Sequence, residues 1–177
     1  MPFQIPDSWM WVRLGDIGSA QTGTTPDTSH SEYFGTDIPF IKPADIYRDH
    51  IDYTNEGLSN EGIQYSRLIS KNSILMVCIG GSIGKCFYTD KEVCCNQQIN
   101  AITPIIINTE YVFYILNSDY FNKVLTEKAT GTATAIINKN SWEQILLPLP
   151  PLKEQKRIVE KVKSLDGLID NMFKLMA

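Results

Sequence analysis

A glycine-rich segment at residues 80–86 is the part of the chain that comes closest to a nucleotide-binding motif. It reads Gly-Gly-Ser-Ile-Gly-Lys-Cys, whereas a phosphate-binding P-loop requires G-x-x-x-x-G-K-[ST]. Ile79 occupies the position of the first glycine, and Cys86 occupies the position of the metal-binding hydroxyl. The sequence also contains no H-E-x-x-H pair of metal ligands. We therefore expect no catalytic residue, no metal site and no enzyme activity in this chain.

The four cysteines are the other residues whose side chains could bind a metal or react. They contain no C-x-x-C pair, and both histidines are far from them in the sequence, so the spacing of a zinc site is absent. Cys78 lies within the apolar run 73–79, which is typical of a buried strand. The vicinal pair Cys94 and Cys95 leaves redox chemistry open as a minor alternative.

Functional side chains need a scaffold that positions them, and the sequence predicts one made mainly of short strands. Apolar and β-branched segments alternate with runs of Gly, Pro, Ser and Thr, which are typical of turns and loops. The apolar segments on either side of the turn 80–84 predict a β-hairpin, and the polar run 19–27 predicts a loop. Prolines within 38–46 favour an edge strand there. We expect strands within residues 9–17, 38–46, 74–79, 85–88, 99–107 and 145–149.

Two helical segments are expected within this β-rich part of the chain. Apolar residues at helical spacing predict a helical stretch from about 109 to 125, with Asn108 or Thr109 as its N-cap. Ser141 and Gln144 have the spacing of a capping box, which predicts a short helical turn before the last strand.

Residues 150–177 predict one long helix with an apolar stripe. A Pro-Pro pair suits its start, because proline at the first helical position loses no hydrogen bond. The stripe has alternating spacings of three and four, as in a coiled coil, although a helix packed on its own domain has a similar stripe. Both arrangements stay open at this point. The stripe consists of Leu152, Ile158, Val162, Leu165, Ile169, Met172 and Met176.

Together these elements predict an α+β fold, with a mixed β-rich domain at 1–149 and one long C-terminal α-helix at 150–177 whose stripe is compatible with a coiled coil. The 177 residues are 43% apolar and 20% charged, which is typical of a folded globular chain. No apolar run reaches the ~20 residues that cross a bilayer, and the N-terminal segment lacks the features of a signal peptide. We therefore expect a cytoplasmic protein without membrane contacts.

The distribution of charge limits how the chain could contact nucleic acid. The net charge is −4, and residues 150–177 hold six cations and four anions, so residues 1–149 carry −6. This sign excludes binding to DNA by bulk electrostatics. A DNA-binding role would need a local cluster of cations, amides and hydroxyls on an acidic body.

Six segments in a fixed order carry a resemblance that covers nearly the whole chain. They lie at 5–17, 22–26, 38–46, 81–85, 96–98 and 147–159, and the last contains the run Pro-Pro-Leu-Lys-Glu-Gln-Lys-Arg-Ile-Val. Each segment alone is weakly specific, but the ordered set resembles one unit of the specificity subunit of type I restriction-modification systems.

The resemblance implies a DNA target recognition domain followed by a helical spacer. In that family two such domains each read one half of a split DNA sequence, and their helices form an antiparallel coiled coil. This chain has one domain and one helix, so it is either a half-subunit that forms a homodimer through its helix or a piece of a longer chain. The implied partners are double-stranded DNA and the methyltransferase and restriction subunits. S-adenosylmethionine, ATP and Mg would be bound by those subunits and not by this chain.

The resemblance also directs attention to the polar loops, because base edges are read by amide, hydroxyl and cationic groups. The stripe residues named above would form the dimer contact. The expected DNA-binding residues are Gln21, Thr22, Thr24, Thr25, Lys42, Ser82, Lys85, Asn96, Gln97, Gln98, Thr130, Thr132, Thr134 and Lys139.

Two other functions remain open from the sequence. The chain could be a protein-assembly module that uses its helix without any preference for DNA sequence, or a recognition domain detached from a fused DNA methyltransferase. For the first interpretation, DNA recognition, we expect the isolated chain to bind DNA weakly and with a shallow salt dependence, since partner subunits would also grip the DNA.

Overall fold

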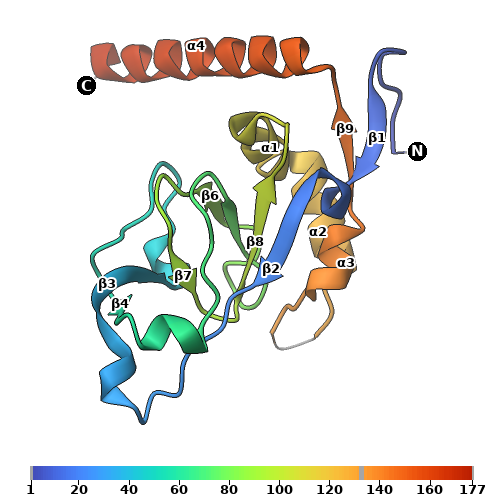
Figure 1. Cartoon of the computed structure of the whole chain (residues 1–177). Helices are drawn as coiled ribbons and strands as arrows, with labels where there is room; N and C mark the ends of the chain where they lie inside the picture. Colours follow the sequence, from blue (N-terminus) through green and yellow to red (C-terminus); the bar gives the residue numbers. More distant parts are fainter. Residues whose placement is uncertain (1, 132–133, 177) are drawn as a thin grey trace.

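The computed structural model describes residues 2–131 and 134–176 and has the predicted α+β architecture (Figure 1). A mixed domain of short strands and helices is followed by one long C-terminal helix. The helices are α1 (Thr109–Leu116), α2 (Asp119–Lys128), α3 (Lys139–Glu143) and α4 (Leu152–Met176). The strands are β1 (Met10–Arg13), β2 (Gly18–Thr22), β3 (Phe34–Ile41), β4 (Gly57–Leu58), β5 (Ile74–Val77), β6 (Cys86–Tyr88), β7 (Cys94–Cys95), β8 (Ile99–Pro104) and β9 (Leu146–Leu149).

The strands in the described part of the chain form three small sheets. The largest is antiparallel with the order β2-β8-β5-β6, and it contains the hairpin of β5 and β6 that the sequence predicts. A second sheet has the order β4-β3-β7, and β1 pairs with β9 to bring the two ends of the domain together. The start of the chain therefore lies beside the segment that leads into α4.

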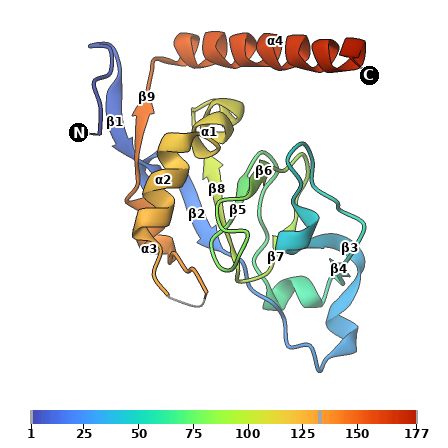
Figure 2. The same cartoon turned by 180° about the vertical axis from the view of Figure 1, so that it is seen from behind.

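The core lies on both faces of the four-stranded sheet. Ile74 and Met76 of β5 pack into the larger cluster with residues of α1, α2 and α3, whereas Leu75 and Val77 pack into a second cluster. All four side chains are fully buried, because successive residues of a strand point to opposite faces and both faces are covered. Figure 2 shows α2 above α3, both to the left of β5 and β8.

Several predicted element boundaries are wrong, each for a local reason. Residues 18–22 form β2 instead of a loop, because β8 supplies a pairing partner along their whole length. Strand β3 is not an edge strand, since it lies between β4 and β7. Pro39 is nevertheless tolerated there, because the pairing with β7 begins only at Phe40.

The predicted helical stretch 109–125 is two helices. Asn108 caps α1 through its side chain, as expected, but Ser118 begins a new helix by accepting a hydrogen bond from the backbone of Phe121. The predicted capping box at residue 141 is wrong as well. The N-cap of α3 is Asn138, whose side chain accepts from the Ser141 backbone N–H at 2.9 Å.

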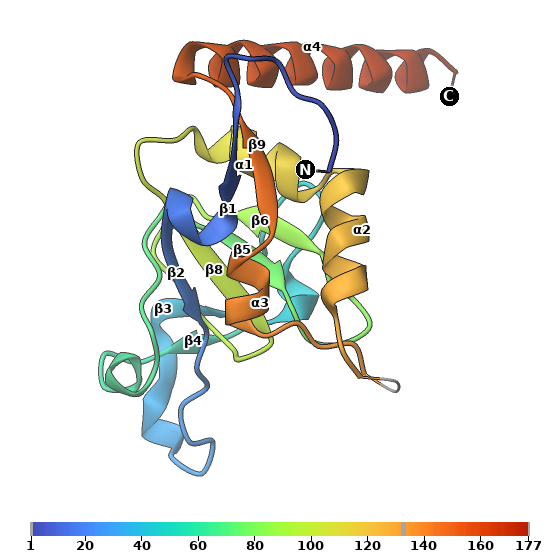
Figure 3. The ribbon, with the colours of Figure 1, turned by 90° about the vertical axis from the view of Figure 1, so that its right-hand side faces the viewer.

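The first half of α4 packs on its own domain. Val159 is buried, and the buried Gln155 side chain accepts from the Asn108 N–H at 3.0 Å and donates to the Pro150 carbonyl at 2.9 Å. Lys163 forms an ion pair with Glu110 of α1. Figure 3 shows α4 spanning one end of the molecule. None of the helices in the described part of the chain is long and apolar enough to cross a bilayer.

The predicted stripe of α4 is partly packed on the domain and partly exposed to solvent. Ile158 and Val162 are half-buried, but Leu165, Ile169 and Met172 are 46%, 49% and 62% exposed. Leu152, at the helix start, is also exposed, and the side chain of Met176 lies outside the described part.

All four cysteines are buried thiols. Burial raises the pKa of Cys94 and of Cys95, so neither side chain readily forms the thiolate that redox chemistry requires. The redox alternative for this pair therefore has no support in the structure.

Candidate nucleic-acid interface

The centre of the candidate interface is the segment 21–25, which we call the strap. It comprises the end of β2 and the loop that follows, and its side chains are hydroxyls and one amide. On one side the strap is bonded to residues 97–100. The Thr22 hydroxyl donates to Asn100 Oδ1 at 2.8 Å, and the Thr25 hydroxyl donates to Gln97 Oε1 at 2.6 Å.

Gly23 brings the strap into direct contact with the connection between β7 and β8. A Cβ atom at this position would lie 2.2 Å from the Asn96 carbonyl oxygen and 2.3 Å from that of Cys95. The Gly23 N–H donates to the Ile99 carbonyl at 3.0 Å. Only glycine allows this close approach, because a Cβ atom would overlap the two carbonyl oxygens.

On its other side the strap is bonded to residues 66–68, which follow a short 3-10 turn. The Ser66 hydroxyl donates to the Thr24 carbonyl at 2.6 Å, and Arg67 Nη1 donates to the Thr22 carbonyl at 3.1 Å. The Gln21 side chain donates to the Leu68 carbonyl at 3.0 Å. Three hydrogen bonds thus form a clasp between segments about 45 residues apart in the sequence.

Arg67 is a candidate interface residue that sequence reasoning missed. It is exposed, and no carboxylate pairs with it among the residues that the structure describes. The only signal in the sequence is a cation in a polar turn, which is common on any protein surface. Its contact with the strap becomes visible only in three dimensions.

Two further loops, one after β5 and one before α3, line a cavity together with Thr22 of the strap. Gln98 Nε2 reaches the Ile79 carbonyl at 3.4 Å, and the Gly80 N–H donates to the Ala135 carbonyl at 2.9 Å. In Figure 1 the loops between β7 and β8 and between α2 and α3 lie at the end of the domain remote from α4. The cavity has a volume of about 210 Å³ and is lined by Thr22, Cys78, Ile79, Gln97, Asn100, Ile136, Ile137, Asn138 and Lys139.

Asn100 is a second residue that the sequence did not single out. Its side chain is buried at the floor of this cavity, where Oδ1 accepts the hydrogen bond from Thr22. Its Nδ2 has no hydrogen-bond partner among the described residues. A buried amide nitrogen without a partner is uncommon, which marks the cavity floor as a polar position within the interface.

The predicted lysines do not present free charges at this interface. Lys42 pairs with Glu56, and Lys139 Nζ lies 2.9 Å from Glu143 Oε1. Lys85 Nζ donates to the Pro43 carbonyl at 3.0 Å and lies over the ring of Tyr47. These three predicted residues have internal partners, because the fold places an acceptor beside each.

The remaining predicted residues have different surroundings. Gln97 is exposed, whereas Asn96 is buried and its side chain is bonded to Gln98. The Thr130 hydroxyl reaches the Ile136 carbonyl at 3.3 Å, and Thr134 is exposed. Ser82 is exposed in the β5–β6 hairpin, and Thr132 lies outside the described residues.

Residues 80–84 fit the G-x-S-x-G pattern of a serine nucleophile, so the expectation that the sequence lacks such a motif is wrong. In α/β-hydrolases this pattern places a nucleophilic serine on a sharp turn from a strand into a helix. Here the segment joins two antiparallel strands, so Ser82 does not occupy such a turn. The pattern therefore gives no reason to assign a nucleophile.

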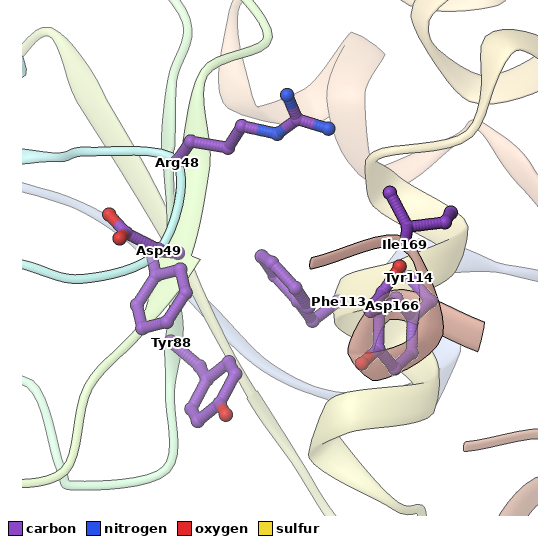
Figure 4. A pocket seen from close by; sticks show the side chains of 8 residues that line it. Arg48, Asp49, Tyr88, Phe113, Tyr114, Asp166 and Ile169 are labelled. Carbon is purple, nitrogen blue, oxygen red and sulfur yellow. The ribbon is translucent and has the colours of Figure 1, made fainter. Parts of the chain in front are cut away.

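A second, larger hollow lies under α4, well away from the strap. Its volume is about 640 Å³, and Figure 4 shows side chains from α4, α1, β6 and the segment after β3 around it. Burial, together with Glu110, raises the pKa of Tyr88, and burial, together with Asp166, raises that of Tyr114. Both tyrosines therefore stay neutral at physiological pH.

Fold and site together define a class of protein: a rigid α+β scaffold that presents hydroxyl, amide and guanidinium groups on converging loops, with a long helix at the opposite end. Among the residues whose side chains the structure describes, no three His, Cys, Asp or Glu gather as metal ligands would. The chain belongs to the family of type I restriction modification DNA specificity domains, whose family model matches residues 6–175.

Curated relatives of this family are more than twice as long as the chain. The HindI specificity subunit of Haemophilus influenzae is 33% identical over 94% of this chain and 38% of its own length. The EcoR124I/EcoR124II specificity subunit of Escherichia coli is 28% identical over 92% of this chain and 42% of its own length. The chain thus spans about two fifths of the relatives that it matches.

Solved structures have the same fold. The HsdS subunit from Thermoanaerobacter tengcongensis superposes with a TM-score of 0.79 at 20% identity, covering 99% of this chain and 41% of that one. A chain from a structural study of type I R-M complex assembly gives a TM-score of 0.78 at 21% identity, covering 98% of this chain and 42% of that one. At this level of identity the likeness concerns the fold alone.

Proposed function

We propose that this chain reads one half of a bipartite DNA target as the specificity component of a type I restriction-modification complex. The observation that carries the proposal is the strap. It is held by hydrogen bonds on both sides, and it sits beside Gln97 and Arg67 at one end of the domain. Side chains of these types read base edges and contact phosphates, and a rigid scaffold gives them a fixed geometry.

In this proposal the chain is non-catalytic, and the chemistry belongs to partner subunits. A methyltransferase subunit with S-adenosylmethionine and a restriction subunit with ATP and Mg would act at the site that this chain selects. Residues 1–149 would form the target recognition domain, and residues 150–177 would form the spacer. The names of the relatives, all specificity subunits of type I restriction enzymes, support the proposed role as a specificity component.

We propose further that two copies associate through a coiled coil of their α4 helices. Leu165, Ile169 and Met172 are exposed apolar side chains on the half of the helix that is not packed on the domain. Residues 152–163 hold five cations and two anions, and residues 164–176 hold one cation and two anions. Antiparallel pairing therefore places opposite charges side by side, and a two-fold dimer would read a palindromic sequence with a gap.

Replacing Gln97 by Ala tests the proposed reading role. Gln97 is exposed, so we expect the variant to fold normally but to lose or relax methylation at the native target. The measurement is a map of methylated positions in cells that carry the chain with its methyltransferase subunit. Gln64→Ala, which changes an exposed glutamine on a 3-10 turn, is the matched control. An unchanged map for Gln97→Ala removes this residue from the interface.

A further inference from the structure

Among the described cations of this interface, Arg67 is the one that is exposed and has no carboxylate partner, whereas Lys85 is half-buried. Lys42 and Lys139 are paired with carboxylates, and Lys85 is bound to a backbone carbonyl. Arg67 is exposed, and within the described part of the chain only one of its donors is engaged, Nη1 with the Thr22 carbonyl at 3.1 Å. A guanidinium has five N–H donors in a planar fork, so the edge formed by Nε and Nη2 is open to a further acceptor.

The clasp holds this guanidinium in a defined position. Its neighbours Ser66 and Leu68 are each bonded to the strap, at 2.6 Å and 3.0 Å. The strap in turn is bonded to Asn100 and Gln97. A charge fixed on both sides loses less conformational entropy on binding than a free surface arginine does.

We propose that Arg67 and the clasp form a binding site for a phosphate group of the DNA backbone, next to the base-reading side chains of the strap. This inference rests on the proposed function. The domain around Arg67 carries −6, so a duplex can approach only where a cation is free and positioned. Arginine binds phosphate through two parallel hydrogen bonds, which the open edge of Arg67 supplies.

The test uses the complex of the full chain with its methyltransferase subunit and a duplex that contains the mapped target. Affinity is measured by fluorescence anisotropy between about 50 and 200 mM salt. Arg67→Gln removes the charge and keeps a polar, uncharged side chain at the same position. We expect its salt slope to fall by about 1 and its affinity to fall by about tenfold, without a change in the preferred sequence.

Arg67→Lys keeps the charge and should therefore keep most of the salt slope. Arg48→Ala removes an exposed arginine at the hollow under α4 and should leave the slope unchanged. An unchanged slope for Arg67→Gln overturns the inference, whether or not the base preference changes. Failure of the proposed function looks different, because the unaltered complex would then show no preferred DNA sequence at all.

Discussion

Gly23 illustrates how the site depends on single residues with no functional group of their own. The backbone of the strap can lie on the Cys95 and Asn96 carbonyls only because no Cβ intervenes. That contact aligns the hydroxyls of Thr22 and Thr25 with their partners on the β7–β8 connection and at the start of β8. At the residue scale, the interface is therefore built from close packing as much as from polar groups.

Gly23→Ala should destabilise the domain by at least about 2 kcal/mol, because the new methyl group would overlap two backbone oxygens. Urea unfolding followed by circular dichroism measures the change. Gly81→Ala is the control, since a Cβ at Gly81 would meet nothing within 4 Å, and its effect should stay within about 0.5 kcal/mol. Equal effects for the two variants would contradict the assigned role of Gly23.

The backbone of Ile106 is strained, and its side chain is too exposed to offset that strain by burial. Ile106 has φ 62°, a conformation that β-branched residues rarely adopt, and it is 88% exposed. Asn72 has the same φ, which asparagine tolerates. Ile106→Asn should therefore raise the free energy of unfolding by about 1 kcal/mol.

The neighbouring Ile105 provides the comparison for this variant. It is also exposed, but its φ is not positive, so Ile105→Asn should bring no gain. If thermal unfolding shows the same shift for both variants, removal of apolar surface and not relief of strain is the cause.

Helix α4 shows how one element can serve two environments. Its first half belongs to the domain through Val159, Gln155 and the ion pair of Lys163 with Glu110. Its second half leaves apolar side chains in solvent, where a monomer gains nothing from them. The periodicity of the stripe predicts the helix but does not reveal this division.

The triple variant Leu165→Lys, Ile169→Lys and Met172→Lys should abolish self-association and leave the domain folded. These side chains are about half exposed or more, so the free energy of unfolding of the domain should change little. Analytical ultracentrifugation and thermal unfolding measure the two properties. Val159→Lys serves as the contrast, because a charge at this buried position should unfold the domain. A triple variant that still dimerises would exclude α4 as the contact.

At the scale of the whole molecule, buried ionisable groups link stability to pH. Burial raises the pKa of Cys78 and of Cys86 to about 12, from an ordinary value of 9.0. Above pH 9 the unfolded chain releases these protons and the folded chain retains them. The unfolded state then binds fewer protons, so the stability that is present below pH 9 is lost as the pH rises toward 12.

We therefore expect the free energy of unfolding to decrease steadily between about pH 9 and pH 11. Urea unfolding at a series of pH values measures the slope. A Cys78→Ala and Cys86→Ala double variant should be less stable at neutral pH but should lose less stability over the alkaline range. A slope that is the same in both proteins would assign the effect to other groups, such as the buried Tyr111.

The sequence by itself determined the elements whose signals are local. The hairpin of β5 and β6, the Asn108 cap and the helix from residue 152 follow from turn residues, a capping side chain and periodic apolar positions. The family resemblance likewise depends on short motifs that can be read along the chain. Local signals are sufficient there because each structure is stabilised by residues that are close in sequence.

Only the tertiary structure decided which polar residues share a surface. Thr22 meets Asn100 over 78 residues and Arg67 over 45, and these pairings depend on the order of strands in the sheet. The same fold gives the predicted lysines internal partners and leaves Arg67 open. Residue type tells which contacts a side chain can make, but the packing of distant segments determines which of those contacts are already occupied.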